Sequence, residues 1–275
     1  MLGPQDLVIT GSTLGHPPFR DLVESAAAGG FAGLSIYPRP VYQAALEAGL
    51  SPDAMRSILA DNDVEVHDVD ALICTGDPRD ENQGGMAADG ERALFEAGEA
   101  LGANYINVVI RSAAPVSVEQ GAEVFAGVSD RAAEHGLVAH LEFLPFMSVR
   151  DAKTAWAIVE QSGRPRSGVM IDSWHFQRTG TTLDDLRAIP GDRILGIQLS
   201  DALAEPMDDV LEETLHHRLL PGDGAIELRP LVAYLREVGS PAPRTAEIFS
   251  DALVDSGSPR EIAIRVGESM RALLA

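Results

Sequence analysis

The chain has very little cysteine, and this limits the kinds of site it can build. Cys74 is the only cysteine in 275 residues. A single thiol excludes internal disulfides and any zinc cluster held by several thiolates. A lone cysteine is most often an inert, partly buried small residue, so we expect no chemical role for Cys74.

Basic residues are also scarce. Lys and Arg total 21 against 42 Asp and Glu, which gives a formal net charge of −21. Nucleic-acid binding draws most of its affinity from basic groups that neutralise phosphates. The composition therefore argues against a nucleic-acid partner.

Long hydrophobic runs are missing as well. The apolar stretches span only a handful of residues, far short of the roughly 20 needed to cross a bilayer. The first residues, "MLGPQDLVITGST", do not follow the basic, apolar and small-residue order of a secretory signal. We expect a cytoplasmic protein with no membrane partner.

Three common nucleotide or metal motifs do not occur. The stretch "TGSTLGHPP" lacks the G-x-G-x-x-G spacing of a dinucleotide site, and the chain contains neither G-x-x-x-x-G-K-[ST] nor H-E-x-x-H. The function must therefore come from another arrangement of side chains.

What the sequence does contain is a repeated alternation of short β-branched runs with Ala-rich helical segments. This pattern predicts βα units and a parallel sheet. The eight expected strands cover residues 6–11, 33–38, 64–72, 105–110, 137–144, 168–172, 194–200 and 244–249. Eight such units in one domain's length favour a single (β/α)₈ TIM barrel over residues 1–275, with a doubly wound open sheet as the competing fold.

Four of the late strands end in polar groups. Glu142, Asp172, Gln198 and Glu247 each close an otherwise apolar run, and the carboxyl ends of barrel strands form the active face. Three carboxylates brought together repel one another, and a divalent cation relieves that repulsion. The oxygen donors suit Mn²⁺ best, with Mg²⁺, Co²⁺ or Zn²⁺ as alternatives. The competing interpretation is that each residue pairs with an arginine or caps a helix.

Two further residues could contact a substrate. His175 follows Asp172 by three residues in "DSWH", close enough to line the same pocket. Arg218, in "HHRLLPGDG", lies in a long segment from which it could reach a substrate hydroxyl or carboxylate. The alternative for Arg218 is an ordinary surface loop.

Polar residues in the early strands are harder to interpret. His16, Tyr37, His67, Asp68 and Asp70 each follow, end or lie near one of the first three strands. Any of them could touch a substrate, but sequence alone favours a structural role for each.

The motifs "HLEF", "DSWH", "RLLPGDG" and "TAEIF" resemble those of the xylose isomerase-like sugar phosphate isomerase/epimerase superfamily. This group of TIM barrels includes ketose 3-epimerases, inosose dehydratases and endonuclease IV, and the resemblance covers essentially the whole chain. It implies that Glu142, Asp172 and Glu247 bind a metal and that Glu142 and Glu247 act as acid and base. It also implies that His175 and Arg218 bind substrate.

One position departs from that family's pattern. Where the ketose epimerases have a histidine ligand, "GIQLSD" places Gln198. An amide oxygen can bind Mn²⁺ or Mg²⁺, but it cannot take up a proton. The expected metal site is unaffected, whereas the identity of the substrate is left open.

These observations lead to one main hypothesis and three alternatives. We expect a metal-dependent sugar isomerase or epimerase that removes a proton next to the carbonyl of an unphosphorylated ketose or polyol. A dehydratase or lyase acting on a keto-cyclitol or 3-keto-glycoside is the first alternative. A non-catalytic sugar-binding barrel and an endonuclease IV-like phosphodiesterase are the others, and assembly into a homo-oligomer stays open.

Overall fold

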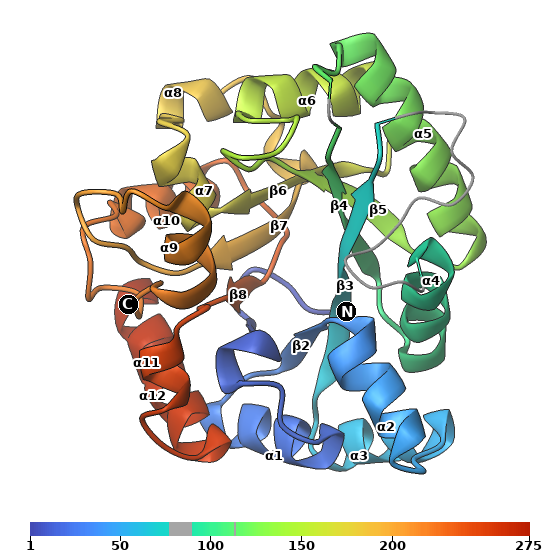
Figure 1. Cartoon of the computed structure of the whole chain (residues 1–275), viewed down its shortest axis with the longest axis vertical. Coiled ribbons are helices and arrows are strands. Elements are labelled where there is room, and N and C mark those ends of the chain that lie inside the picture. The colour runs from blue at the N-terminus through green and yellow to red at the C-terminus, as the bar shows by residue number, and fades with distance from the viewer. Residues whose placement is uncertain (77–89, 113) are drawn as a thin grey trace.

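Eight parallel strands close into a barrel in the order in which they occur along the chain (Figure 1). We describe the protein from a computed structural model that places residues 1–76, 90–112 and 114–275. The closed ring confirms the predicted (β/α)₈ TIM barrel and excludes the doubly wound open sheet. The strands are β1 (Leu7–Thr10), β2 (Gly33–Ile36), β3 (Glu65–Cys74), β4 (Tyr105–Ile110), β5 (Val138–Glu142), β6 (Gly168–Asp172), β7 (Ile194–Leu199) and β8 (Arg244–Ala246).

Helices surround the strands on the outside of the barrel (Figure 1). Serine or aspartate caps begin several of them: Ser117 and Ser258 each form a capping box, and the Asp151 side chain accepts the backbone N–H of Thr154. The helices are α1 (Phe19–Gly29), α2 (Ala44–Glu47), α3 (Pro52–Asp61), α4 (Gly90–Leu101), α5 (Val118–Glu134), α6 (Ala152–Gln161), α7 (Ser173–Arg178), α8 (Leu183–Leu186), α9 (Val210–His216), α10 (Leu228–Glu237), α11 (Asp251–Val254) and α12 (Pro259–Leu274). Among the described residues, no helix has both the length and the apolar character needed to cross a bilayer.

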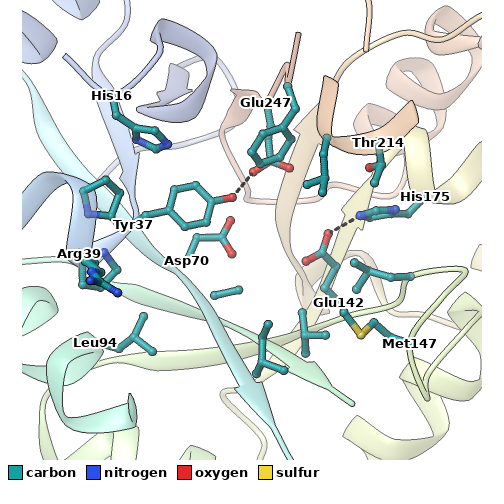
Figure 2. A pocket seen from close by; sticks show the side chains of 18 of the residues that line it. His16, Tyr37, Arg39, Asp70, Leu94, Glu142, Met147, His175, Thr214 and Glu247 are labelled. Atoms are coloured by element: carbon teal, nitrogen blue, oxygen red, sulfur yellow. Dashed lines mark hydrogen bonds and ion pairs between the residues drawn. The ribbon is translucent and has the colours of Figure 1, made fainter. Parts of the chain in front are cut away.

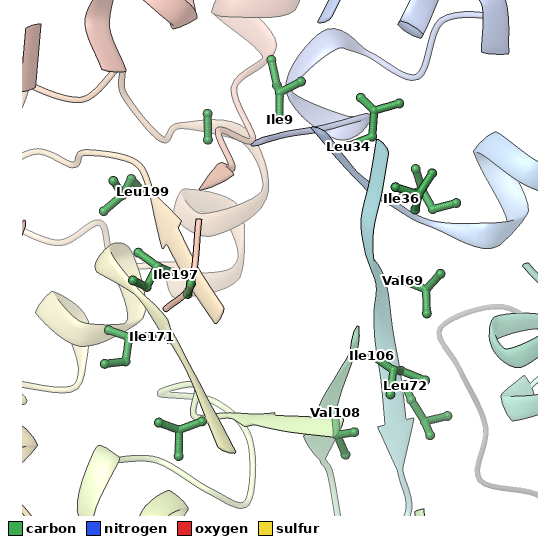
Figure 3. Packing of buried hydrophobic residues seen from close by; sticks show 14 of the residues in the cluster. Ile9, Leu34, Ile36, Val69, Leu72, Ile106, Val108, Ile171, Ile197 and Leu199 are labelled. Carbon is green, nitrogen blue, oxygen red and sulfur yellow. The ribbon is translucent and has the colours of Figure 1, made fainter. Parts of the chain in front are cut away.

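The main hydrophobic core lies between the sheet and the helices (Figure 3). Leu141, Ile171 and Ile197 belong to this core and are at most 1% exposed. Side chains alternate along a strand, so the residues flanking these three face the barrel interior. The period of two thus turns the polar residues of β5, β6 and β7 inward.

The last strand is shorter than the sequence predicts. β8 ends at Ala246, whereas the expected strand ran to residue 249. The backbone N–H of Glu247 still donates to the carbonyl of Leu199, but that of Ile248 donates to the Thr13 hydroxyl at 2.8 Å. Glu247 therefore lies where the chain leaves the sheet.

Candidate active site

A cavity of about 360 Å³ lies at the carboxyl ends of the strands (Figure 2). Four of the six residues proposed from sequence line it: Glu142, His175, Arg218 and Glu247. Asp172 and Gln198 do not line the cavity but are buried and hydrogen-bond to residues that do. The rest of the wall is largely apolar and includes Ile73, Leu94, Val109, Leu144, Phe146, Met147 and Phe249.

Asp172 ends β6 and caps the helix that follows. Its Oδ1 accepts the backbone N–H of His175 at 2.9 Å, which fixes the first turn of α7. Its Oδ2 accepts Nη1 of Arg218 at 2.8 Å. Burial opposes its ionisation, but Arg218 and His175 hold the pKa of Asp172 below its ordinary value. Asp172 is therefore a carboxylate at neutral pH.

His175 faces Glu142 from the first turn of α7. Its Nε2 lies 3.4 Å from Oε1 of Glu142 (Figure 2). Burial lowers the pKa of His175 to about 3, so the ring is neutral and able to bind a metal. One ligand atom each from Glu142, Asp172 and His175 lie within 4.8 Å of one another. This triad could hold a metal ion.

Glu142 ends β5 and is 5% exposed. Its Oε2 accepts Nδ2 of Asn107 at 2.7 Å. Burial and the neighbouring carboxylates, Asp70 first among them, raise the pKa of Glu142 well above its ordinary value.

Glu247 enters the site directly after β8. Its Oε1 accepts the Tyr37 hydroxyl at 3.0 Å and Nε2 of Gln198 at 3.1 Å, and Oε2 lies 3.3 Å from Nη1 of Arg218. Burial raises the pKa of Glu247 well above its ordinary value, although Arg218 opposes the shift. Burial also raises the pKa of Tyr37, which keeps the hydroxyl protonated and donating.

Arg218 is buried between two carboxylates. It is 2% exposed, and its Nε and Nη2 donate to the backbone and hydroxyl oxygens of Thr214. The guanidinium lies over the rings of Trp174 and Phe249, at 5.4 and 5.0 Å from their centroids. Despite the cost of burial, Asp172 and Glu247 raise the pKa of Arg218. Arg218 is thus not a loose surface residue, as the alternative from sequence would have it.

The donor set fits a divalent cation. Glu142, Asp172 and Glu247 are three buried carboxyl groups, and the guanidinium of Arg218 forms ion pairs with two of them, Asp172 and Glu247. If all three were ionised, the buried negative charge would exceed the positive charge. Oε1 of Gln198 is buried without a hydrogen-bond partner in the described part of the chain. Carboxylate and amide oxygens beside a neutral imidazole are ligands that divalent metals accept.

Three further polar residues belong to the site. From sequence, Asp70 and Tyr37 were named as able to touch a substrate but a structural role was favoured for each, and Asn107 was not named. Asp70 lines the cavity and accepts amide hydrogens from Asn107 and Gln198, each at 2.9 Å. Tyr37 donates to Glu247. Asn107 gave a usable signal, since it is a polar residue inside the apolar run "YINVVI". Asp70 and Tyr37 gave none beyond their place near strand ends.

A second set of buried polar groups lies earlier on two of the same strands. His67 and Asp68 precede Asp70 on β3, and His140 precedes Glu142 on β5. His67, Asp68 and His140 are at most 2% exposed, and among the described residues neither ring nitrogen of His67 or of His140 has a hydrogen-bond partner. Burial raises the pKa of Asp68 to about 8 and lowers that of His67 to about 4. Asp68 is therefore mostly a neutral acid at neutral pH, while His67 is a neutral base.

The sequence is similar to a known protein family and to several enzymes. The family model described as xylose isomerase-like TIM barrel matches residues 23–273. The 3-dehydroshikimate dehydratase of Pseudomonas aeruginosa is 28% identical over 232 residues, which are 83% of this chain and 36% of that enzyme. The inosose isomerase of Bacillus velezensis is 28% identical over 170 residues, 58% of each protein. The chain thus spans less than two thirds of these relatives.

A solved structure shows the same fold over nearly the full length. The crystal structure of the IOLI protein with a binding zinc atom superposes with a TM-score of 0.84 and 21% sequence identity, covering 98% of both chains. Its barrel and the barrel of this chain therefore share one architecture.

Proposed function

The chain belongs to the xylose isomerase-like TIM barrel family, and we propose that it is a divalent-metal-dependent isomerase or epimerase of a ketose or related polyol. The reaction begins with removal of a proton next to a carbonyl and passes through an enediolate. One observation carries the proposal: two buried carboxyl groups point into a single cavity, Glu142 from the end of β5 and Glu247 from the residue after β8 (Figure 2).

The surroundings of these two glutamates suit proton transfer. A carboxyl group is an effective acid or base when its pKa approaches the working pH. Burial raises the pKa of both Glu142 and Glu247. One glutamate removes the proton as a carboxylate, and the other returns it as a carboxylic acid. Return from the opposite side of the carbon gives an epimer.

Glu142, Asp172 and His175 are the residues that would hold the metal, with Oε1 of Gln198 and the Glu247 carboxylate as further oxygen donors. A bound divalent cation would polarise the carbonyl and acidify the adjacent C–H group. The zinc atom bound in the crystal structure of the IOLI protein supports our proposal of a divalent metal in this chain. Because a neutral amide oxygen replaces the histidine of the ketose epimerases at residue 198, we propose Mn²⁺ in this chain.

His175 and Arg218 remain our proposed substrate contacts. Both line the cavity. Arg218 is fixed by Thr214 and by the ring faces of Trp174 and Phe249, so it presents a hydrogen-bond donor in a set direction. His175 offers a neutral ring nitrogen beside Glu142. The ring can bind either a substrate oxygen or the metal.

Elimination of water is the second candidate reaction. It shares the first proton removal and differs only in what the enediolate or enolate does next, namely expel a β-hydroxyl group. The 3-dehydroshikimate dehydratase relative, aligned over 83% of this chain, supports this candidate.

Solvent exchange tests the proposal directly. The Mn²⁺-loaded protein is incubated in D₂O with ketoses, keto-inositols and cyclic β-hydroxy ketones, and NMR follows deuterium at the carbon next to the carbonyl. We expect exchange that EDTA abolishes, and the products separate epimerisation from elimination. No exchange into any compound, together with no bound metal, would refute an enzyme of this kind.

A further inference from the structure

Five buried side chains form a continuous hydrogen-bonded chain between the two proposed acid–base residues. Nδ2 of Asn107 donates to Glu142 at 2.7 Å and to Oδ1 of Asp70 at 2.9 Å. Nε2 of Gln198 donates to Oδ2 of Asp70 at 2.9 Å and to Glu247 at 3.1 Å. All five are at most 5% exposed. The order is therefore Glu142, Asn107, Asp70, Gln198, Glu247.

Asp70 is the residue at which the two halves of this chain meet. Asn107 and Glu142 come from β4 and β5, whereas Gln198 and Glu247 come from β7 and the end of β8. Asp70, on β3, uses one carboxylate oxygen for each half. Within the described structure the two glutamates form no hydrogen bond to each other, so Asp70 is their structural link.

The carboxylate of Asp70 also fixes which end of each amide faces a glutamate. A side-chain amide has a donor end and an acceptor end. Both NH₂ groups are directed at carboxylates, and the oxygens Oδ1 of Asn107 and Oε1 of Gln198 have no hydrogen-bond partner among the described residues. If either amide turned over, its oxygen would face Glu142 or Glu247 and repel the carboxylate. Two acceptor oxygens on Asp70 prevent that turn.

We propose that Asp70 is a positioning residue that orients Asn107 and Gln198 and thereby holds Glu142 and Glu247 as an aligned pair for proton transfer. This inference rests on the proposed function of the two glutamates. Asp70 itself need not touch the reacting carbon. The four amide-to-carboxylate hydrogen bonds specify this one arrangement, because each NH₂ group donates to two carboxyl groups.

The first test is Asp70→Asn. An asparagine offers only one acceptor oxygen, so its own NH₂ group opposes one of the two neighbouring amides. Partners that orient active-site groups typically contribute about 10- to 100-fold to activity, so we expect kcat to fall by that factor. KM should change by less than about threefold, because cavity contacts that bind substrate are kept.

Asp68→Asn is the matched control. Asp68 lies two residues earlier on β3 and is buried to the same degree, but the amides of Asn107 and Gln198 donate to Asp70 and not to Asp68. Its kcat should stay within about threefold of the parent, the range in which no transition-state interaction is lost. Equal losses of kcat in the two variants would overturn the proposal, because replacing any buried aspartate of β3 would then have the same effect.

A second readout does not depend on activity. NMR of the Mg²⁺-loaded protein can follow hydrogen exchange of the side-chain NH₂ groups of Asn107 and Gln198. We expect slow exchange in the parent and in Asp68→Asn, and at least about tenfold faster exchange in Asp70→Asn, as expected when a buried hydrogen bond of about 1.4 kcal/mol is lost. Unchanged exchange in Asp70→Asn would overturn the proposal even if kcat fell.

The outcomes separate this inference from the proposed function. If the parent shows no activity on any compound, the proposed function fails, and the amide exchange alone decides whether Asp70 orients the two amides. If Asp70→Asn does not fold, Asn107→Ser removes the bridge to Glu142 and leaves Asp70 in place. That variant should lose at least about tenfold in kcat, and full activity would refute the inference.

Discussion

Glu142 and Glu247 differ in what faces them, although both are buried carboxyl groups of one cavity. Glu247 accepts the Tyr37 hydroxyl and lies 3.3 Å from Nη1 of Arg218, whereas Glu142 accepts Asn107 and lies beside neutral His175. The cation and the hydroxyl donor stabilise the carboxylate form of Glu247. At the residue scale, Glu247 is therefore the better base and Glu142 the better acid.

This difference gives the first prediction. Glu247→Gln should abolish deuterium exchange into substrate, and Glu142→Gln should keep some exchange while losing product formation. General acid–base groups typically contribute about 10² to 10⁴ in rate, so each variant should lose at least about 10² in kcat. The exposed Glu160→Gln serves as control. Full activity in Glu247→Gln would refute its role as base.

A second prediction concerns Asp68 and pH. Its folded-state pKa of about 8 lies above the ordinary value of 3.8, so the folded protein keeps a proton that the unfolded chain has lost. Stability from this group is complete below pH 3.8 and is lost as the pH rises towards about 8. In the parent, Asp68 should make the free energy of unfolding fall by up to about 1.4 kcal/mol per pH unit, and Asp68→Asn should abolish this part of the fall.

Urea unfolding of the metal-free protein between pH 6.5 and 8 checks this slope. His67 contributes little to the slope in this range. Its pKa is lowered to about 4, so its contribution to the stability of the protein is lost only as the pH falls below about 6.5. Parallel slopes for the parent and Asp68→Asn would contradict a neutral, protonated Asp68.

The residues of the candidate site could be predicted from sequence where they close an apolar run or, like His175 and Arg218, fall in a motif close to such a residue or in a long loop. Asp172 and Gln198 are register partners on β6 and β7, and their place at the close of apolar runs was visible in the sequence. A structural role was favoured for Asp70, because its importance comes from contacts with Asn107 and Gln198, the latter 128 residues away. Such pairings depend on barrel closure, which no local pattern encodes.

At the scale of elements, the sequence predicted all eight strands, two of them, β4 and β6, with the same bounds as the structure. The alternation of apolar and polar residues explains this success. Strand ends were less predictable, because hydrogen bonds to distant groups decide them. The contact between Ile248 and Thr13, which ends β8 early, is one example.

The first and last helices, α1 and α12, approach each other closely, and this gives a third prediction. A Cβ atom added at Gly267 on α12 would lie 2.1 Å from the backbone oxygen of Gly29 on α1. Backbone cannot yield as a side chain does, so Gly267→Ala should cost about 1 to 3 kcal/mol. Circular dichroism can monitor thermal unfolding, and Tm should fall by about 2–4 °C for each kcal/mol of lost stability.

Gly127→Ala on α5 is the matched control. There the added Cβ meets only the end of the Arg131 side chain, at 3.2 Å. Replacing an unstrained helical glycine by alanine stabilises a protein by about 0.5 to 1 kcal/mol. The two substitutions should therefore shift Tm in opposite directions, and a shared direction would contradict the close-packed contact between α1 and α12.

At the scale of the whole molecule, negative charge is the dominant feature. The net charge of −21 is spread over the chain, and three of the acidic groups, Glu142, Asp172 and Glu247, are buried in one site where Arg218 pairs with Asp172 and Glu247. Surface carboxylates are solvated, whereas buried ones repel strongly and shift their pKa values. A divalent cation should thus stabilise the fold as well as serve the reaction.

The last prediction follows from this linkage. Mn²⁺ at about 100 times its Kd should stabilise the EDTA-treated protein by about 2.7 kcal/mol, or about 5 to 10 °C in Tm. Because binding requires ionised Glu142, whose pKa is raised, the shift should grow as the pH rises from about 6 to about 8. Differential scanning fluorimetry measures both effects, and Glu142→Gln should lose most of the shift. If neither Mn²⁺, Mg²⁺, Co²⁺ nor Zn²⁺ raises Tm at any pH in that range, the buried carboxylates are balanced by Arg218 and protonation alone, and the metal site is refuted.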